Sequence, residues 1–243
     1  MNSLLNLFHL ILYQPLLNIL VFLYKILPIR DFGLAVIILT ILIRICLFPL
    51  AVRSLQSQKK LADLQPRLKE IQQKYKDNKE KQFQEIMKIY EKEKINPFSS
   101  LILLIQTPIL IALYWVIRQG LQPSEMIYLY NFISPPEVIN PIFLGLINLT
   151  EPHLGIAFLA GFCQFIQTKL SLKQTQSQVI KQADNKNQAL VNQFSEIMQK
   201  QMLYFWPFFI VFILVKLPAV IGLYWLISSL FSIGQQYLIW RRI

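Results

Sequence analysis

Long apolar stretches alternate with polar segments along the chain, and four stretches are long enough to cross a bilayer as helices. They cover residues 32–52, 98–117, 153–170 and 219–240. A fifth stretch, 202–215, has 14 residues. As a helix it would cover about 21 Å, against roughly 30 Å of hydrocarbon. The tight connection Lys216-Leu217-Pro218 makes a hairpin of the last two stretches. The pattern predicts an all-α polytopic membrane protein with five spans.

Composition supports this class, and charge adds an orientation. Hydrophobic residues make up 54% of the 243 residues, charged residues make up 15%, and the mean hydropathy is +0.44. Lys and Arg exceed Asp and Glu by 24 to 13. In a membrane protein such an excess reflects the positive-inside rule, although a surface for ribosomal RNA is an alternative.

The charges are distributed unevenly among the polar segments. Residues 53–94 hold 12 Lys or Arg and seven acids, and residues 168–201 hold five Lys and two acids. Residues 119–152 hold three Glu and no Lys or Arg, and Arg241-Arg242 lies at the end. The positive-inside rule therefore puts the N-terminus outside and the C-terminus in the cytoplasm. The rule predicts that residues 119–152 form an extracytoplasmic loop and that residues 171–201 form a cytoplasmic loop.

Residues 1–30 allow two interpretations. They are apolar enough for a sixth span, but Pro15 interrupts the run, and polar residues recur at helical spacing: Asn2, Asn6, His9 and Tyr13, then Gln14, Asn18 and Lys25. We favour an amphipathic helix lying on the outer face of the membrane. A cleaved signal peptide is disfavoured, because the first alanine is Ala35.

Residues 54–96, between the first two spans, predict an antiparallel helical hairpin in the cytoplasm. Its apolar positions form one narrow seam: Leu64, Leu68, Ile71 and Tyr75, then Phe83, Ile86, Met87 and Tyr90. Pro66 suits a first helical turn, so the second part of the arm is expected to begin there. The arm is either a solvated structural element or a docking platform for lipid headgroups or a cytosolic protein.

Arg44 lies at position 13 of the 21-residue stretch 32–52, with no acidic residue nearby. A charge near the centre of a span costs about 2.5–3.5 kcal/mol on insertion scales. Counted from the cytoplasmic ends, Arg44, Gln106 and Ser232 all lie about 12 Å deep, and Gln164 about 9 Å. Four spans therefore bring polar side chains to one level of the inner leaflet.

These polar residues also share helix faces. Thr40 lies one turn before Arg44, and two longer stripes occur: Gln164, Gln167, Thr168 and Ser171, then Trp225, Ser228, Ser229, Ser232, Gln235 and Gln236. Single Ser or Gln residues in spans often only join helices. That alternative does not account for an unpaired Arg. The joint interpretation is a water-filled groove that opens to the cytoplasm and is closed to the outside.

Catalytic and metal chemistry find little support. The five spans contain no Asp or Glu, and His153 stands at one edge. Cys46 and Cys163 lie in apolar stretches without ligand-like neighbours, so they resemble small buried hydrophobic residues. The sequence predicts no metal, no cofactor and no enzyme.

Several short motifs follow one another in order along the spans. The first span carries Asp31-Phe32-Gly33, Ile43-Arg44 and Pro49-Leu50, and the second carries Asn96-Pro97-Phe98, Gln106-Thr107-Pro108 and Ala112-Leu113-Tyr114. Further matches follow in order at Phe143-Leu144-Gly145, 164–169, Pro218-Ala219, Leu223-Tyr224-Trp225 and 232–236. Each motif is weak alone, but the ordered set covers nearly the whole chain from about residue 14. Taken together, these motifs resemble the YidC-type membrane protein insertases.

The resemblance implies a five-span core at 31–243, an external amphipathic helix and a hydrophilic groove. By its motif positions, Arg44 would receive the polar or acidic tail of a nascent membrane protein. Groove residues would be Arg44, Gln106, Thr40, Gln164, Gln167, Ser228, Ser232 and Gln235. The apolar segment would leave sideways into lipid along Tyr114, Trp115 and Trp225. The expected location is a bacterial plasma membrane, because the sequence shows no transit peptide.

Two departures and two rival functions accompany this interpretation. Val220-Ile221-Gly222 replaces the usual glycine after Pro-Ala, and the sequence ends at Ile243 without the basic tail that many relatives use at the ribosome. Ribosome and Sec translocon therefore remain possible partners only. The first rival is a small-anion transporter or channel with Arg44 as its site, and the second is a structural scaffold for a membrane complex.

Overall fold

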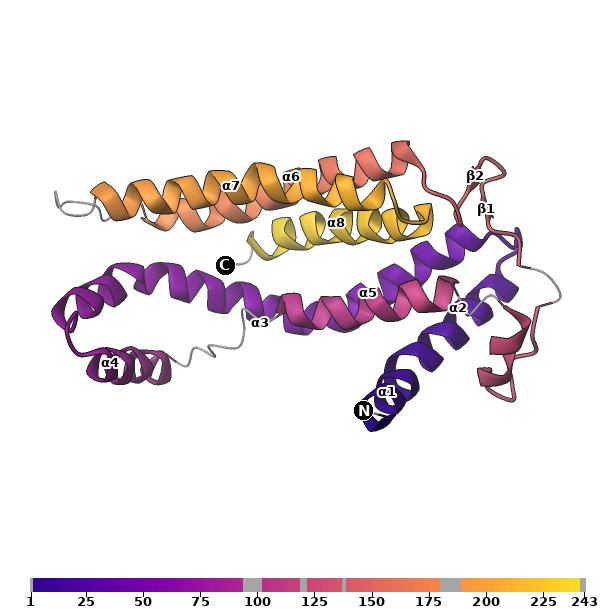
Figure 1. Ribbon diagram of the computed structural model, residues 1–243, viewed down its shortest axis with the longest axis horizontal. Helices are drawn as coiled ribbons and strands as arrows, with labels where there is room; N and C mark the ends of the chain where they lie inside the picture. The colour runs from indigo at the N-terminus through magenta and orange to yellow at the C-terminus, as the bar shows by residue number, and fades with distance from the viewer. Residues whose placement is uncertain (1, 94–101, 119–121, 137–138, 180–188, 241–243) are drawn as a thin grey trace.

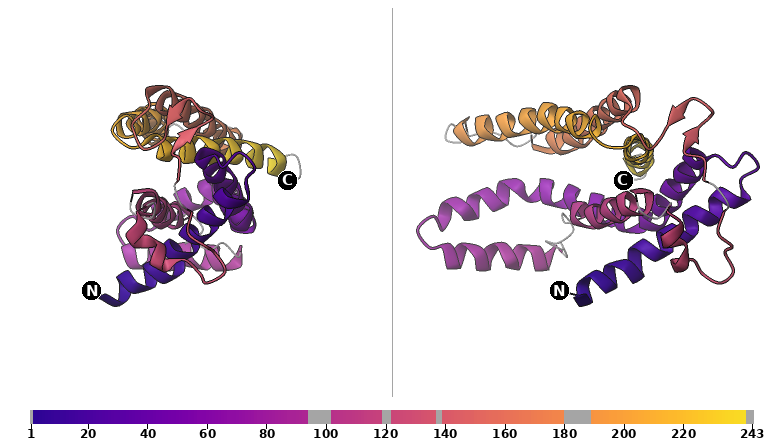
Figure 2. Two further views of the ribbon diagram at one scale, coloured as in Figure 1. Left: turned by 90° about the vertical axis from the view of Figure 1, so that its right-hand side faces the viewer. Right: turned by 45° about the vertical axis from the view of Figure 1, so that its right-hand side comes forward.

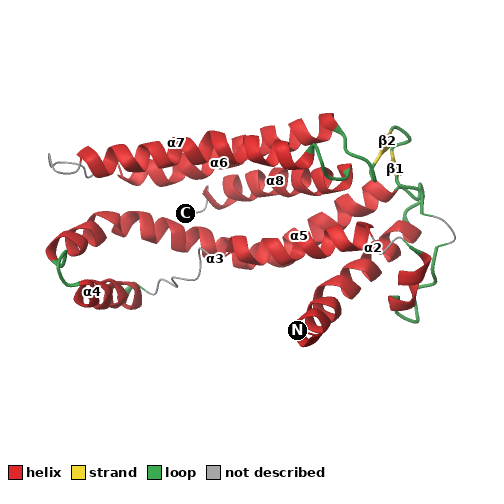
Figure 3. Cartoon of the chain, in the orientation of Figure 1, coloured by secondary structure: helices red, strands yellow, loops and turns green. Residues whose placement is uncertain are grey.

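Helices form nearly all of the regular structure, as Figures 1 and 3 show for the computed structural model. It describes residues 2–93, 102–118, 122–136, 139–179 and 189–240. Five helices run along the long axis of the molecule: α3 (Phe32–Lys74), α5 (Ile102–Arg118), α6 (Leu154–Val179), α7 (Ala189–Leu214) and α8 (Ala219–Trp240). We call the end near the turn at 75–78 the arm end. The opposite end, where residues 122–136 and 139–153 lie, is the loop end.

The N-terminal segment is one helical run, inclined to the long axis in Figures 1 and 2. It consists of α1 (Asn2–Phe8), a π-helical turn η1 (His9–Tyr13) and α2 (Gln14–Ile26). Pro15 does not interrupt it, contrary to the sequence prediction. Proline has no N–H and crowds the carbonyl four residues back. The wider π turn accommodates it, because the Gln14 N–H donates to the His9 carbonyl five residues earlier.

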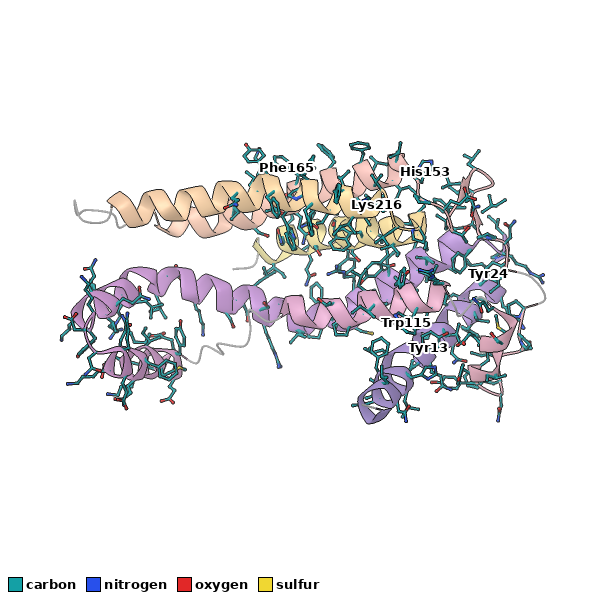
Figure 4. All side chains as sticks on the ribbon, viewed as in Figure 1. Tyr13, Tyr24, Trp115, His153, Phe165 and Lys216 are labelled. Atoms are coloured by element: carbon teal, nitrogen blue, oxygen red, sulfur yellow. The ribbon has the colours of Figure 1, made fainter. Side chains whose placement is uncertain are left out.

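The polar residues of this run bind the loop-end segment. Asn18 is buried, and its Nδ2 donates to the carbonyls of Gln14 (2.8 Å) and Tyr128 (3.0 Å). Its Oδ1 accepts from the Tyr130 N–H at 2.7 Å. Four more contacts repeat the pattern: Tyr13 to Glu125, Gln14 to Tyr128, Asn140 to Tyr24 and Lys25 to Ser134. Figure 4 labels Tyr13 and Tyr24 on this run. The polar side chains therefore serve a contact within the protein.

Among the residues that the structure describes, three helical segments are long and apolar enough to cross a membrane. They are Leu5–Ile26, Phe32–Ser57 and Leu154–Leu172, and Thr107–Arg118 and Leu203–Leu214 are shorter apolar helices. The last of these has 12 residues, about 18 Å of helix, which agrees with the short span predicted at 202–215. The helix α8 has the predicted bounds 219–240. The all-α membrane fold is thus confirmed, and the interfacial position of residues 1–30 stays a prediction.

The helix α3 continues without a break from the loop end into the arm. Its 43 residues span about 65 Å, roughly twice the hydrocarbon thickness. Pro66 lies within this helix, so the prediction that a second part of the arm begins there was wrong. After the turn, α4 (Lys79–Lys92) folds back, capped by Asn78 Oδ1, which accepts from the Lys81 N–H.

The arm packs largely along the predicted seam, with one exception on α4. Leu68 of α3 and Ile89 of α4 are buried, whereas Phe83 is 65% exposed. Side chains also bond between the two helices, since Gln82 Nε2 donates to the Gln72 carbonyl at 3.0 Å. The arm is a helical hairpin as predicted, with Ile89 in the position expected of Phe83.

A short antiparallel hairpin closes the loop end. Strands β1 (Ile142–Phe143) and β2 (Ile147–Asn148) pair with Phe143 opposite Ile147. Asp31 caps α3 by accepting from the Leu34 N–H at 2.9 Å, and its second oxygen accepts from the Leu144 N–H at 2.6 Å. One carboxylate therefore joins the start of α3 to the strand hairpin. The 3-10 helix η3 (Pro123–Tyr128) lies in the same loop segment.

The apolar core is concentrated toward the loop end. Its fully buried members include Leu17, Val36, Leu113, Leu149 and Val220. Small residues bring helices together there. A Cβ on Gly161 of α6 would lie 2.1 Å from Val211 of α7, and one on Gly222 of α8 would lie 2.8 Å from Ile156 of α6. Toward the arm end, α6 continues to Val179 and α7 begins at Ala189, so much of the loop predicted at 171–201 is helical.

Replacing Asn18 with Leu is expected to weaken the contact between the N-terminal run and the loop end. The Tyr128 carbonyl and Tyr130 N–H would lose their partner, at about 1–3 kcal/mol for each unpaired buried group. The thermal unfolding temperature of the purified protein in detergent should fall. Asn6→Leu, at an exposed position of the same run, is the control and should change it little. Equal melting of both variants would contradict this role of Asn18.

Candidate functional site

The helix α8 carries a broad polar arc beyond the apolar core. At about 100° per residue, seven of its side chains fall within roughly 140° of the helix circumference. In order around the helix they are Tyr224, Gln235, Ser228, Ser232, Trp225, Gln236 and Ser229. All except Trp225 are buried. The arc has two edges, and each edge has a different environment.

The edge toward α6 is held by hydrogen bonds centred on Gln164. Its Oε1 accepts from Trp225 Nε1 at 3.0 Å and from Ser229 Oγ at 3.3 Å. Its Nε2 donates to Thr168 Oγ1 at 3.3 Å, and that hydroxyl donates to the Gln164 carbonyl at 2.9 Å. Two helical turns after Ser229, Gln236 Nε2 donates to Ser171 Oγ at 2.9 Å. The amide of Gln164 is therefore engaged between α6 and α8.

The other edge of the arc lies toward α3, where Arg44 stands. Helices α3 and α8 pack together, and the Tyr224 phenol is within electrostatic range of the Arg44 guanidinium. Three buried polar atoms on this side have no hydrogen-bond partner among the described residues: Arg44 Nε, Ser228 Oγ and Gln235 Nε2. A fourth, Gln236 Oε1, lies nearer the edge toward α6. Buried polar atoms are normally paired, so a cluster of unpaired ones needs an explanation.

The hydroxyl groups of Thr40 and Ser232 make hydrogen bonds within their own helices. Thr40 Oγ1 donates to the Val36 carbonyl at 2.6 Å, and Ser232 Oγ donates to the Ser228 carbonyl at 2.9 Å. Such bonds to the preceding turn keep a hydroxyl satisfied inside a span. Both residues are buried, and each hydroxyl donates within its own helix.

The remaining predicted site residues lie apart from this cluster or beyond what the structure describes. Gln106 belongs to α5, and its side chain is outside the described part of the chain. Gln167 is half-buried on α6. On α5, Tyr114 accepts a hydrogen bond from Arg118, and Trp115 is exposed (Figure 4). The predicted exit residue Trp225 is half-buried and bonded to Gln164.

Tyr224 was not predicted as a site residue. Its signal was available in the sequence, because it lies four residues before Ser228 and eleven before Gln235, a helical spacing. The pattern is ambiguous, because Tyr224 beside Trp225 also fits a lipid-facing aromatic pair. In the parts of the chain described, no group of three or more His, Cys, Asp or Glu side chains is placed to hold a metal.

Membrane-length helices that carry a half-buried arginine together with buried amides and hydroxyls define a polytopic helical membrane protein with an intramembrane polar site. The family model for the 60Kd inner membrane protein matches residues 22–243. The chain belongs to this family, and it resides in a membrane.

Curated relatives agree with this assignment. The "Membrane protein insertase YidC" of Francisella tularensis subsp. novicida (strain U112) is 30% identical over 212 residues, which cover 87% of this chain and 33% of the relative. The same values hold for the proteins of subsp. tularensis (strain WY96-3418) and subsp. holarctica (strain FTNF002-00 / FTA). The chain thus spans about a third of the length of the curated relatives it matches.

Gln164→Leu should separate the bonded edge of the arc from the unpaired one. Trp225 Nε1 and Ser229 Oγ would lose their acceptor, at about 0.6–2 kcal/mol for each interhelical bond in a membrane. The unfolding temperature in detergent is expected to fall, whereas Gln167→Leu, one turn along the same face of α6, should change it little. If Gln167→Leu proves as harmful, the hydrogen bonds are not the cause.

Proposed function

We propose that this chain is a membrane protein insertase and chaperone, which moves hydrophilic parts of nascent membrane proteins across the bilayer. The observation that carries the proposal is the set of buried, unpaired polar atoms on α3 and α8, at Arg44, Ser228, Gln235 and Gln236. Such atoms are costly in a resting protein. A polar segment of a client, or water entering with it, would supply the missing hydrogen bonds. The family and its YidC members support the same activity.

Arg44 would attract the negative charge of an entering segment. Two unit charges 4 Å apart interact by about 4 kcal/mol at an effective dielectric constant of 20, against about 1 kcal/mol in bulk water. A guanidinium in a protein stays charged and donates several hydrogen bonds. Its attraction should therefore be largest for clients with an acidic tail, and Gln106, Thr40, Gln164, Gln167, Ser232 and Gln235 would line or support the groove.

The position of the core favours a groove that is open at one end only. On α3 the buried apolar residues run from Phe32 to Leu39, and the polar positions Thr40 and Arg44 follow toward the arm. On α8 the apolar run ends at Leu223, before the polar arc begins. We infer that the arm end faces the cytoplasm, with the N-terminus outside and the C-terminus inside. A polar segment would then enter from the cytoplasm.

Release into lipid would follow from apolar surfaces beside the groove. Trp115 on α5 is exposed, Tyr114 precedes it, and the Trp225 ring is half-buried on α8. The apolar part of α7, Leu203–Leu214, is shorter than the bilayer and would thin it locally. A thinner bilayer would shorten the path of the polar segment. Burial of the apolar part of the client in lipid would drive insertion without ATP. The activity is therefore non-enzymatic and needs no cofactor.

The partners of this activity would be nascent membrane proteins and the lipid bilayer, in a bacterial plasma membrane. The ribosome and the Sec translocon remain candidate partners. The rival small-anion transporter would need a polar path through the bundle. The apolar core between Thr40 and the loop end argues against such a path.

Arg44→Ala is expected to reduce insertion of a short single-span reporter with an acidic tail several-fold in cells depleted of the native insertase. Arg44→Lys should keep most of the activity if charge is what matters, because lysine is also a cation. Arg53→Ala, an exposed position on the same helix, is the control. The assay measures protease protection of the reporter.

Equal failure of the Ala and Lys variants would indicate that the guanidinium shape or its packing matters. A reporter with a neutral tail should lose less activity in Arg44→Ala. If an acidic-tailed reporter inserts normally in Arg44→Ala, the charge mechanism is wrong. Anion flux through liposomes lacking any client would instead support the transporter.

Gln235→Leu should stabilise the protein while reducing insertion. It removes an unpaired buried amide, which is worth about 1–3 kcal/mol of stability, and it also removes a group that the client would use. The unfolding temperature in detergent should rise as activity falls. Ser229→Ala, which breaks a bond that exists in the resting protein, should lower stability. A loss of both stability and activity in Gln235→Leu would contradict this proposal.

A further inference from the structure

The strand hairpin at the loop end has two apolar faces, and only one packs on the protein. Phe143 faces inward, because a Cβ on Gly33 of α3 would lie 2.2 Å from its ring. Alternate residues point to opposite sides of a strand. The outward positions Ile142, Leu144 and Leu146 are 42%, 58% and 85% exposed. The hairpin thus presents three large aliphatic side chains that no described part of the chain covers.

The backbone of the hairpin tip is unfavourable for the residue it carries. Leu144 has a φ of 50° and Gly145 a φ of 72°, within a turn closed by the Leu146 N–H donating to the Phe143 carbonyl at 3.0 Å. Two successive positive φ values favour Asn-Gly, and leucine rarely adopts them. Asp31 holds the Leu144 N–H in place. A strained leucine with an exposed side chain gains little from the protein itself, so its benefit lies outside the chain.

The surroundings of the hairpin indicate which environment its exposed side chains contact. No charged residue occurs from 139 to 150. Asp31 and Gly33, which hold the tip, stand at the start of the span Phe32–Ser57, so the tip lies level with the end of that span. The span Leu154–Leu172 begins close by in the chain, and its first turns expose Leu154 and Phe158. The hairpin and the start of this span therefore both expose apolar side chains.

We propose that the tip Leu144-Gly145-Leu146, with Ile142, inserts into the interfacial layer of the leaflet at the loop end and anchors this loop to the membrane. The partner is the lipid surface. Aliphatic side chains without neighbouring charge suit the boundary between headgroups and acyl chains. The anchor does not depend on the insertase activity, and it would fix the Asp31 end of α3 relative to the bilayer.

Environment-sensitive fluorescence of the full chain in vesicles tests this anchor. Cys46 and Cys163 are replaced with Ala, and Leu146→Cys carries a nitrobenzoxadiazole label in phosphatidylcholine–phosphatidylglycerol vesicles. Ser124→Cys, an exposed polar position of the same loop segment, is the matched control. We expect a several-fold smaller quenching constant for aqueous iodide at 146 than at 124, with strong quenching at 146 by lipid carrying a nitroxide near its headgroup.

Equal iodide quenching at the two positions would overturn the proposal, since the tip would then lie in water. Protection at 146 that disappears as the protein is diluted with lipid would overturn it in favour of a second copy of the chain. Leu144→Asn, made in the Leu146→Cys background, keeps a residue suited to positive φ but removes apolar surface. It should raise iodide quenching at 146 without lowering the unfolding temperature. Unchanged quenching would contradict the anchoring role of Leu144.

Discussion

A polar atom inside a membrane must find a partner within the protein, because hydrocarbon offers none. The organisation of α8 follows from this constraint. Toward α6, the amide of Gln164 gathers the donors of Trp225 and Ser229, and the edge is closed. Toward α3, Arg44 and Gln235 keep atoms without partners. The same helix thus divides into a side whose polar groups bond to a neighbouring helix and a side that keeps polar atoms unpaired.

The asymmetry along the helices complements this division. Apolar packing fills the loop-end part of the bundle, where Gly161 and Gly222 let neighbouring helices approach closely. The loop segment itself is fixed from two directions, by Asn18 of the N-terminal run and by Asp31 at the start of α3. Its carbonyls at Leu149 and Glu151 also accept from the first N–H groups of α8. A bundle so firmly closed at one end can leave polar atoms unpaired toward the other end and still fold.

Helix positions could be predicted from the sequence, because apolar length and helical spacing are local properties. The bounds of α8 and the short apolar part of α7 are examples. The hydrogen-bond partners of the polar side chains could not be predicted. Gln164 was expected beside Arg44, yet it bonds to Trp225, because rotation of α6 about its axis depends on packing at Gly161 and Ile156. The predictions of an interruption at Pro15 and of a helix start at Pro66 failed for a related reason. A π turn or a long helix tolerates proline when its surroundings hold the backbone.

The unbroken helix α3 has a mechanical consequence. A rod of 43 residues that carries Arg44 in the bilayer and the arm beyond it behaves as a lever. Asp31 pins one end of the lever to the loop hairpin. A sideways displacement of the arm therefore tilts the guanidinium as well, unless the rod bends between them, and Pro49 marks a position where one backbone hydrogen bond is missing. Whatever touches the arm thereby acts on the polar site at a distance.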